Sequence, residues 1–210
     1  MSSEAGRKAV YTFLPGGFSC SLHPMISMKP FLLAFACLVL AAAAPATTEK
    51  TEEVCVLKTN LGTMVFRFYE QEAPLTTAHI KKLVRDGFYD GKRFYRVVKG
   101  HVIQTGDGEG SGPTVKAEIN SHLHLEGSMG LAHGESPDSG NSEIYICLAP
   151  RPHLDGKFVV FAQIVDGKDV LEKIGDVPVD EHYVENHVAF HSPKEPVIIE
   201  KATIETRPVP

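Results

Sequence analysis

The sequence predicts one mostly β domain that also contains two helices. Short runs rich in Val, Ile, Phe and Tyr recur along the chain and are separated by Gly-containing turns, a pattern typical of strands. Only the segments 76–87 and 169–175 have the apolar spacing and end signals of a helix. Many short strands would leave exposed sheet edges unless the sheet closes, so we expect a closed barrel.

The first predicted elements are a hairpin and a helix. Residues 54–57 and 63–68 read as strands, and residues 59–62 supply the tight turn between them. Residues 71–74 interrupt this pattern, after which Thr76 or Thr77 can cap a helix that ends near Gly87. The apolar stripe of this helix consists of Ala78, Ile80, Leu83 and Val84.

The remaining elements are mainly strands. Residues 94–98 and 102–105 favour extended backbone and are joined by a Lys99-Gly100 turn. The Gly-rich segment 106–112 is predicted to be a flexible loop, because no helix follows it and Asp107 and Glu109 would repel a phosphate. We expect further strands at 126–132, 144–148, 158–165 and 197–204, and a short helix at 169–174.

The segment 28–46 predicts a secretory signal. Lys29 precedes an apolar run at 31–44, and Ala44-Pro45-Ala46 fits cleavage after Ala46. Retention of the run as a membrane anchor and lipid attachment at Cys37 are alternatives, although the run is shorter than the ~20 residues that span a bilayer. Residues 1–27 are interpreted as an over-called translation start or a disordered extension. Residues 47–210 would then form a domain exported to the periplasm, or secreted, or sent into the secretory pathway of a eukaryote.

The net charge limits the classes of binding partner, and the cysteine positions bear on whether the domain has a disulfide. The formal net charge of −5 makes nucleic acid and anionic membrane surfaces unfavourable partners, and we expect a monomer. Cys55 and Cys147 both lie in apolar strand runs, so two buried free thiols are favoured over a disulfide.

Two polar residues able to do chemistry, Arg96 and Gln104, lie within the apolar run 94–107, Phe-Tyr-Arg-Val-Val-Lys-Gly-His-Val-Ile-Gln-Thr-Gly-Asp. This run resembles the cyclophilin signature F-H-R-V-I-x-x-F-M-I-Q-G-G-D. Residues 139–147 and 154–161 resemble two further cyclophilin motifs, S-x-x-S-Q-F-F-I and L-D-G-x-x-V-F-G-x-V, in the expected order. The resemblance extends from about Val54 to the end of the chain and is to the compact bacterial type.

The resemblance implies a fold and an activity. The fold is an eight-stranded antiparallel barrel capped by two helices, with a groove on its outer face. The activity is peptidyl-prolyl cis-trans isomerisation, rotation about an Xaa-Pro bond whose barrier is about 18–20 kcal/mol. Lowering this barrier requires an apolar pocket and a donor to the proline nitrogen, but no metal or cofactor. Arg96 takes the place of the catalytic arginine, and Gln104 that of the glutamine that orders it and contacts the substrate backbone.

Departures from the family pattern cluster in the same groove. Leu154 is kept at the pocket floor, but six other substrate-binding positions differ, which predicts weaker or differently tuned activity and a groove that responds to pH near 6.5. Poor cyclosporin binding is expected because His153 lacks the indole donor of a tryptophan. The six positions are His101, Val102, Glu143, Tyr145, His153 and Phe158.

Two alternatives remain open. The domain could be a low-turnover peptide-binding or chaperone module on the same scaffold, since a fold does not fix a function. The histidines also raise a metal hypothesis, in which His101, His133 and His153 border one groove and His122 and His124 form a second pair. No zinc-type spacing supports it, and no metal is predicted.

Overall fold

The computed structural model describes residues 50–108, 112–183 and 189–209. The predictions for 1–27 and for the signal at 28–46 fall outside the described residues, as does part of the predicted loop at 106–112. Within the described part of the chain, no helix is long and apolar enough to cross a membrane.

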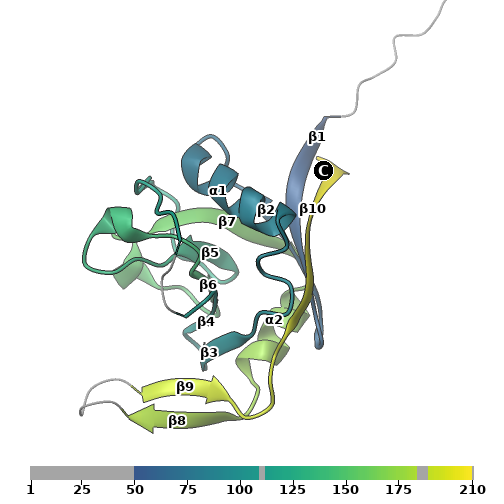
Figure 1. The fold of residues 1–210 in the computed structure, drawn as a ribbon, viewed down its shortest axis with the longest axis vertical. Helices are drawn as coiled ribbons and strands as arrows, with labels where there is room; N and C mark the ends of the chain where they lie inside the picture. The colour runs from purple at the N-terminus through teal and green to yellow at the C-terminus, as the bar shows by residue number, and fades with distance from the viewer. Residues whose placement is uncertain (1–49, 109–111, 184–188, 210) are drawn as a thin grey trace, which may run out of the picture. The chain divides into compact units, whose positions relative to one another are not determined.

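One antiparallel sheet of eight strands curves around the core (Figure 1). Its two edges are β10 and β3, so the predicted closure of the barrel is wrong. Backbone segments at these edges meet through an isolated bridge between Arg93 and Ile198 and then diverge, because β10 continues along β1. In spatial order the strands are β10 (Ile199–Pro208), β1 (Thr51–Thr59), β2 (Gly62–Phe68), β7 (Val159–Asp166), β5 (Ser128–Leu131), β6 (Ile144–Cys147), β4 (Val102–Thr105) and β3 (Phe94–Val98).

The core fills the concave side of this sheet. Every second side chain of each strand points inward, as the period of two in a pleated strand requires. Helices α1 (Pro74–Arg85) and α2 (Lys168–Gly175) bury Ile80 and Leu171 against the same core, as the two predicted helices require. Fully buried members of this core include Leu57, Met64, Phe66, Phe94, Ile103, Ile146 and Phe161.

The start of α1 differs from the prediction. Pro74 opens the helix, and neither Thr76 nor Thr77 acts as the N-cap, which is Ala73 without a side-chain bond. The Glu118 carboxylate instead accepts hydrogen bonds from the backbone N–H of Leu75 at 2.9 Å and of Thr76 at 2.8 Å. A carboxylate is favourable there because the first N–H groups of a helix lack partners within the helix.

A second, two-stranded sheet was not predicted. It consists of β8 (Val179–Tyr183) and β9 (Ala189–Pro193), lies beneath β3 in Figure 1, and contacts β3 through β9. Asp180 and Glu181 lie within β8, and acidic residues are depleted in strands, which explains why the pattern was missed. Two short 3₁₀ helices, η1 (Pro137–Ser139) and η2 (Pro152–Leu154), complete the described structure.

Candidate active site

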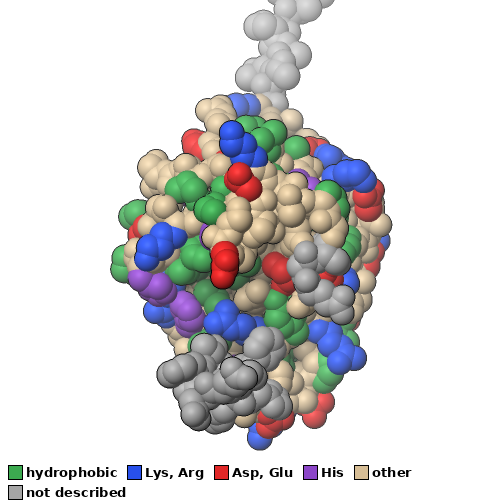
Figure 2. All heavy atoms as spheres, turned by 60° about the vertical axis from the view of Figure 1, so that its left-hand side comes forward, with side chains coloured by type: hydrophobic (Ala, Val, Ile, Leu, Met, Phe, Trp, Pro, Cys, Tyr) green, Lys and Arg blue, Asp and Glu red, His purple; other side chains and the backbone are tan. Residues whose placement is uncertain are grey.

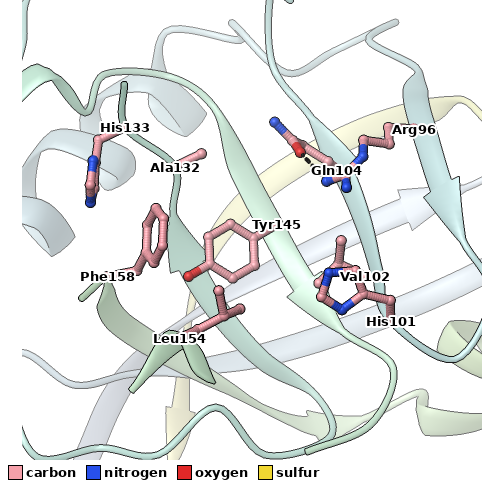
Figure 3. A pocket seen from close by; sticks show the side chains of 9 residues that line it. All are labelled: Arg96, His101, Val102, Gln104, Ala132, His133, Tyr145, Leu154 and Phe158. Carbon is pink, nitrogen blue, oxygen red and sulfur yellow. Dashed lines mark hydrogen bonds between the residues drawn. The ribbon is translucent and has the colours of Figure 1, made fainter. Parts of the chain in front are cut away.

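A cavity of about 320 Å³ opens on the outer face of β3, β4 and β6 (Figure 3). Its lining includes seven of the nine predicted site residues, together with Ala132 and His133, which were not among those nine. The predicted residues in its lining are Arg96, His101, Val102, Gln104, Tyr145, Leu154 and Phe158.

Strand register brings the central three side chains together. Arg96 on β3 pairs with Gln104 on β4, which in turn pairs with Tyr145 on β6. The next residues along the strands, Val97 and Ile103, are fully buried in the core. Alternation along a strand therefore turns the three polar side chains outward into one row across the groove.

The floor of the cavity is apolar. Val102 and Tyr145 form a buried cluster with Cys147, and Ala132, Leu154 and Phe158 pack against it. The ring of Phe158 meets that of Tyr145 edge-on, with centroids 6.1 Å apart, and His133 stacks on Phe158 at 4.3 Å. Such a surface suits a small apolar ring such as that of proline.

A chain of hydrogen bonds holds the arginine. Arg96 Nη1 donates to Gln104 Oε1 at 3.1 Å, and Gln104 Nε2 donates to the Tyr95 hydroxyl oxygen at 2.7 Å. The Tyr95 hydroxyl donates its own proton to Glu143 Oε2, and Glu143 Oε1 accepts from the backbone N–H of Gly108 at 2.7 Å. The single O–H of Tyr95 is used in the hydrogen bond to Glu143, so the Tyr95 oxygen can only accept a hydrogen bond from Gln104. The amide nitrogen of Gln104 therefore faces Tyr95, and its amide oxygen faces Arg96.

Burial affects the ionisable members of this chain. It lowers the pKa of Arg96, but arginine remains charged because its ordinary pKa lies so high. Burial, with the Glu143 carboxylate, raises the pKa of Tyr95, which keeps the phenol a proton donor at neutral pH. Tyr95 was not among the predicted site residues, although it stands beside Arg96 in the signature run.

Histidines lie at one end of the groove. Burial, with the nearby charge of Arg151, lowers the pKa of His101 to about 4, so this ring does not titrate near 6.5 as expected. His153 does not line the cavity and lies at its rim, its ring centroid 5.7 Å from that of His101. Figure 2 shows histidine side chains grouped at one edge of the face that it draws.

A buried histidine supports the pocket wall from behind. His124 Nε2 lies 2.8 Å from the Tyr145 hydroxyl, and its Nδ1 lies 2.8 Å from Asp155 Oδ1. When Nδ1 carries the ring proton and donates it to Asp155 in a hydrogen bond, Nε2 accepts a hydrogen bond from the Tyr145 hydroxyl. Burial raises the pKa of Tyr145, so this hydroxyl stays protonated at neutral pH. Sequence reasoning missed this role, because His124 and Tyr145 lie in separate segments.

The metal hypothesis gains no geometric support. Among the described residues, no three His, Cys, Asp or Glu side chains form a group that could hold a metal ion. His122 stacks on Tyr69 with centroids 3.6 Å apart, whereas His124 faces Asp155 and Tyr145, so the two do not act as a chelating pair. Cys55 and Cys147 are buried free thiols, as predicted, and burial raises the pKa of each to about 12.

Comparison with known proteins identifies the class to which this fold and groove belong. Residues 54–204 match the family described as cyclophilin type peptidyl-prolyl cis-trans isomerase/CLD, and the chain belongs to this family. It is thus a cyclophilin-type isomerase, which confirms the predicted family and enzyme class.

Relatives in bacteria and yeast have the same activity in their names. A peptidyl-prolyl cis-trans isomerase of Synechococcus elongatus is 38% identical over 120 residues, which cover 55% of this chain and 82% of the relative. Peptidyl-prolyl cis-trans isomerase ppi1 of Schizosaccharomyces pombe is 37% identical over 133 residues, 59% of this chain and 86% of the relative.

The fold also matches solved cyclophilins. A cyclophilin type isomerase of Cryptosporidium parvum, crystallised in the presence of the dipeptide Ala-Pro, superposes with a TM-score of 0.65 at 24% identity. The match covers 72% of this chain and 98% of that structure. It confirms a mostly β cyclophilin fold with two helices.

Proposed function

We propose that this isomerase rotates Xaa-Pro bonds of exported polypeptides and that Arg96 is the donor to the proline nitrogen. The observation that carries the proposal is the position of the guanidinium. It is held by Gln104 beside a cavity of about 320 Å³ whose floor is apolar. Val102, Tyr145 and Leu154, which line the cavity with Arg96 (Figure 3), would receive the proline ring, and Arg96 would then face the bond to be rotated.

The chemistry needs only this arrangement. As the Xaa-Pro bond twists, the amide loses resonance and the proline nitrogen becomes pyramidal, with a lone pair that accepts a hydrogen bond. A donor already in place stabilises this state more than the planar ground state, and the half-buried position of Arg96 strengthens the effect by excluding water. Gln104 keeps the guanidinium in place and contacts the substrate backbone.

Export and drug response are further parts of the proposal. The apolar run at 31–44 followed by Ala44-Pro45-Ala46 supports a cleaved signal, and mass spectrometry of the protein recovered from its host should find Thr47 as the first residue. His153 at the groove rim supports weak cyclosporin binding, because imidazole does not reproduce the indole donor. The domain is proposed to act as a monomer on proline-containing polypeptides.

The deciding experiment is an isomerisation assay on Xaa-Pro peptides, with Arg96→Ala and Arg96→Lys as test variants. Loss of one transition-state donor should lower kcat/KM by about 10²–10³-fold. Arg85→Ala is the matched control, because Arg85 is an exposed arginine on α1 that pairs with Glu53 away from the groove. Full activity in Arg96→Ala would refute the assigned role.

A low-turnover binding module is the second candidate. The polar side chains of His101 and Glu143, in place of the usual Phe and Gln, favour it. The same assay separates the two, because a binding module would bind proline peptides with no catalysed exchange in either the unmodified protein or Arg96→Ala.

A further inference from the structure

A second cavity, of about 230 Å³, adjoins the proline cavity. The two share Gln104, Ala132 and His133 in their linings, so they form one continuous groove. Glu143 and Asn141 line this side pocket but not the proline cavity. A peptide whose proline occupies the first cavity therefore extends past the second.

The Glu143 carboxylate is held rigidly in the side pocket. The residue is only 8% exposed, and Gly108 N–H and the Tyr95 hydroxyl fix one oxygen each. Gly106 makes room for it, since a Cβ at position 106 would lie 2.2 Å from Glu143 Oε1. The carboxylate cannot move away to solvent without losing both hydrogen bonds.

This carboxylate has no ion-pair partner in the part of the chain that the structure describes. The ion pairs of residues 50–108, 112–183 and 189–209 include none to Glu143. His133, the histidine in the wall of this pocket, has its ring nitrogens at the carbonyl oxygens of Gly134 and Lys157, at 2.7 Å and 3.0 Å, and not at Glu143. Each carboxylate oxygen accepts about two hydrogen bonds, so each retains acceptor capacity.

A buried carboxylate without a counter-charge is unfavourable, and a ligand that supplies a cation relieves this cost. Chain geometry limits the position of the cation on the peptide. In an extended peptide, side chains alternate faces and rise about 3.3–3.4 Å per residue, so the side chains two residues before and two residues after the proline point into the groove with the proline ring. Gln104, the proposed contact for the substrate backbone, lines both cavities, so a peptide that it holds passes both.

We infer that Glu143 selects substrates with Lys or Arg two residues before the proline, in the pattern (Lys/Arg)-Xaa-Pro. The inference rests on the proposed function, because it places the proline in the cavity beside Arg96. It names Glu143 as a specificity residue that contacts the substrate side chain rather than its backbone.

The test compares Lys-Ala-Pro, Met-Ala-Pro and Glu-Ala-Pro peptides by exchange NMR, which needs no coupling protease that could itself discriminate between them. The unmodified protein should have a kcat/KM about tenfold higher for the Lys than for the Met peptide, as expected for a partly desolvated charge pair. The Glu peptide should be the poorest. Glu143→Gln should abolish the Lys-to-Met ratio, and Glu200→Gln, at an exposed glutamate of β10, should preserve it.

Two further measurements keep the outcomes distinct. Raising the salt concentration should reduce the Lys preference of the unmodified protein, which requires no variant to fold. Peptide titration followed by NMR should give the same Lys-to-Met order in affinity, so the inference is tested even without turnover. Equal values for Lys and Met, or a preference that Glu143→Gln retains, would overturn it. Absence of Arg96-dependent exchange would instead refute the proposed function.

Discussion

Replacement of Tyr145 by Phe should destabilise the protein without removing its activity. The Tyr145 hydroxyl and His124 Nε2 lie 2.8 Å apart, and the two residues are only 4% and 1% exposed. The variant leaves Nε2 buried without a partner, and an unsatisfied buried group costs about 1–3 kcal/mol. For a domain of this size, each kcal/mol corresponds to about 2–4 °C in Tm.

Urea unfolding at neutral pH, followed by far-UV circular dichroism, measures this loss. Tyr69→Phe is the matched control, because among the described residues no hydrogen bond of the Tyr69 hydroxyl is present, and its free energy of unfolding should change by less than about 0.5 kcal/mol. Isomerase activity should persist, since the ring still packs on Phe158 and Leu154. An unchanged urea midpoint for Tyr145→Phe would refute the argument. In a protein that already carries His124→Leu, Tyr145→Phe should cost little further stability, and a loss as large as in the unmodified protein would also refute it.

Three further predictions follow from the hydrogen bonds. Tyr95→Phe removes the acceptor that fixes the Gln104 amide, so kcat in the isomerisation assay should fall about tenfold to a hundredfold. An unchanged kcat would show that the hydrogen bond from Gln104 to Tyr95 does not position Arg96. Glu118→Gln places an amide N–H against donors at the start of α1 and should lower the free energy of unfolding by about 1–2 kcal/mol in urea titrations, whereas no change would exclude Glu118 as the cap. Hydrogen bonds from His124 lower the pKa of Asp155, so its contribution is complete above its ordinary pKa of 3.8 and is lost as pH falls through the lowered value. Asp155→Asn should therefore flatten the acid side of a stability-versus-pH curve, and an unchanged acid limb would contradict this.

Much of the candidate site was predictable because it lies in a short signature. Arg96 and Gln104 are separated by one tight turn, so their pairing across a hairpin follows from the local pattern alone. Val102, Tyr145, Leu154 and Phe158 were assigned through motif resemblance, and all four line the cavity. His153, assigned in the same way, is absent from the lining and lies next to it on η2, with its ring beside that of His101, so its role in substrate binding stays a prediction.

Other parts of the site depend on contacts between distant segments. Glu143 reaches Tyr95 only because β6 pairs with β4, and no local pattern specifies that neighbour. The pKa of His101 departs from 6.5 because burial and Arg151 act on it, and neither is visible along the chain. The cap of α1 by Glu118 is likewise a contact across 43 residues.

The sequence by itself determined the family, the β character, the two helices and the place of Arg96 and Gln104 in two neighbouring strand segments, because hydrophobic patterning and motif spacing are local properties. Only the tertiary structure decided that the sheet stays open between β3 and β10, that β8 and β9 form a separate hairpin, and that the Glu143 carboxylate, which has no ion pair among the described residues, lies in a pocket beside the cavity of Arg96. These features arise from register and burial, which are set by contacts between segments far apart in the chain.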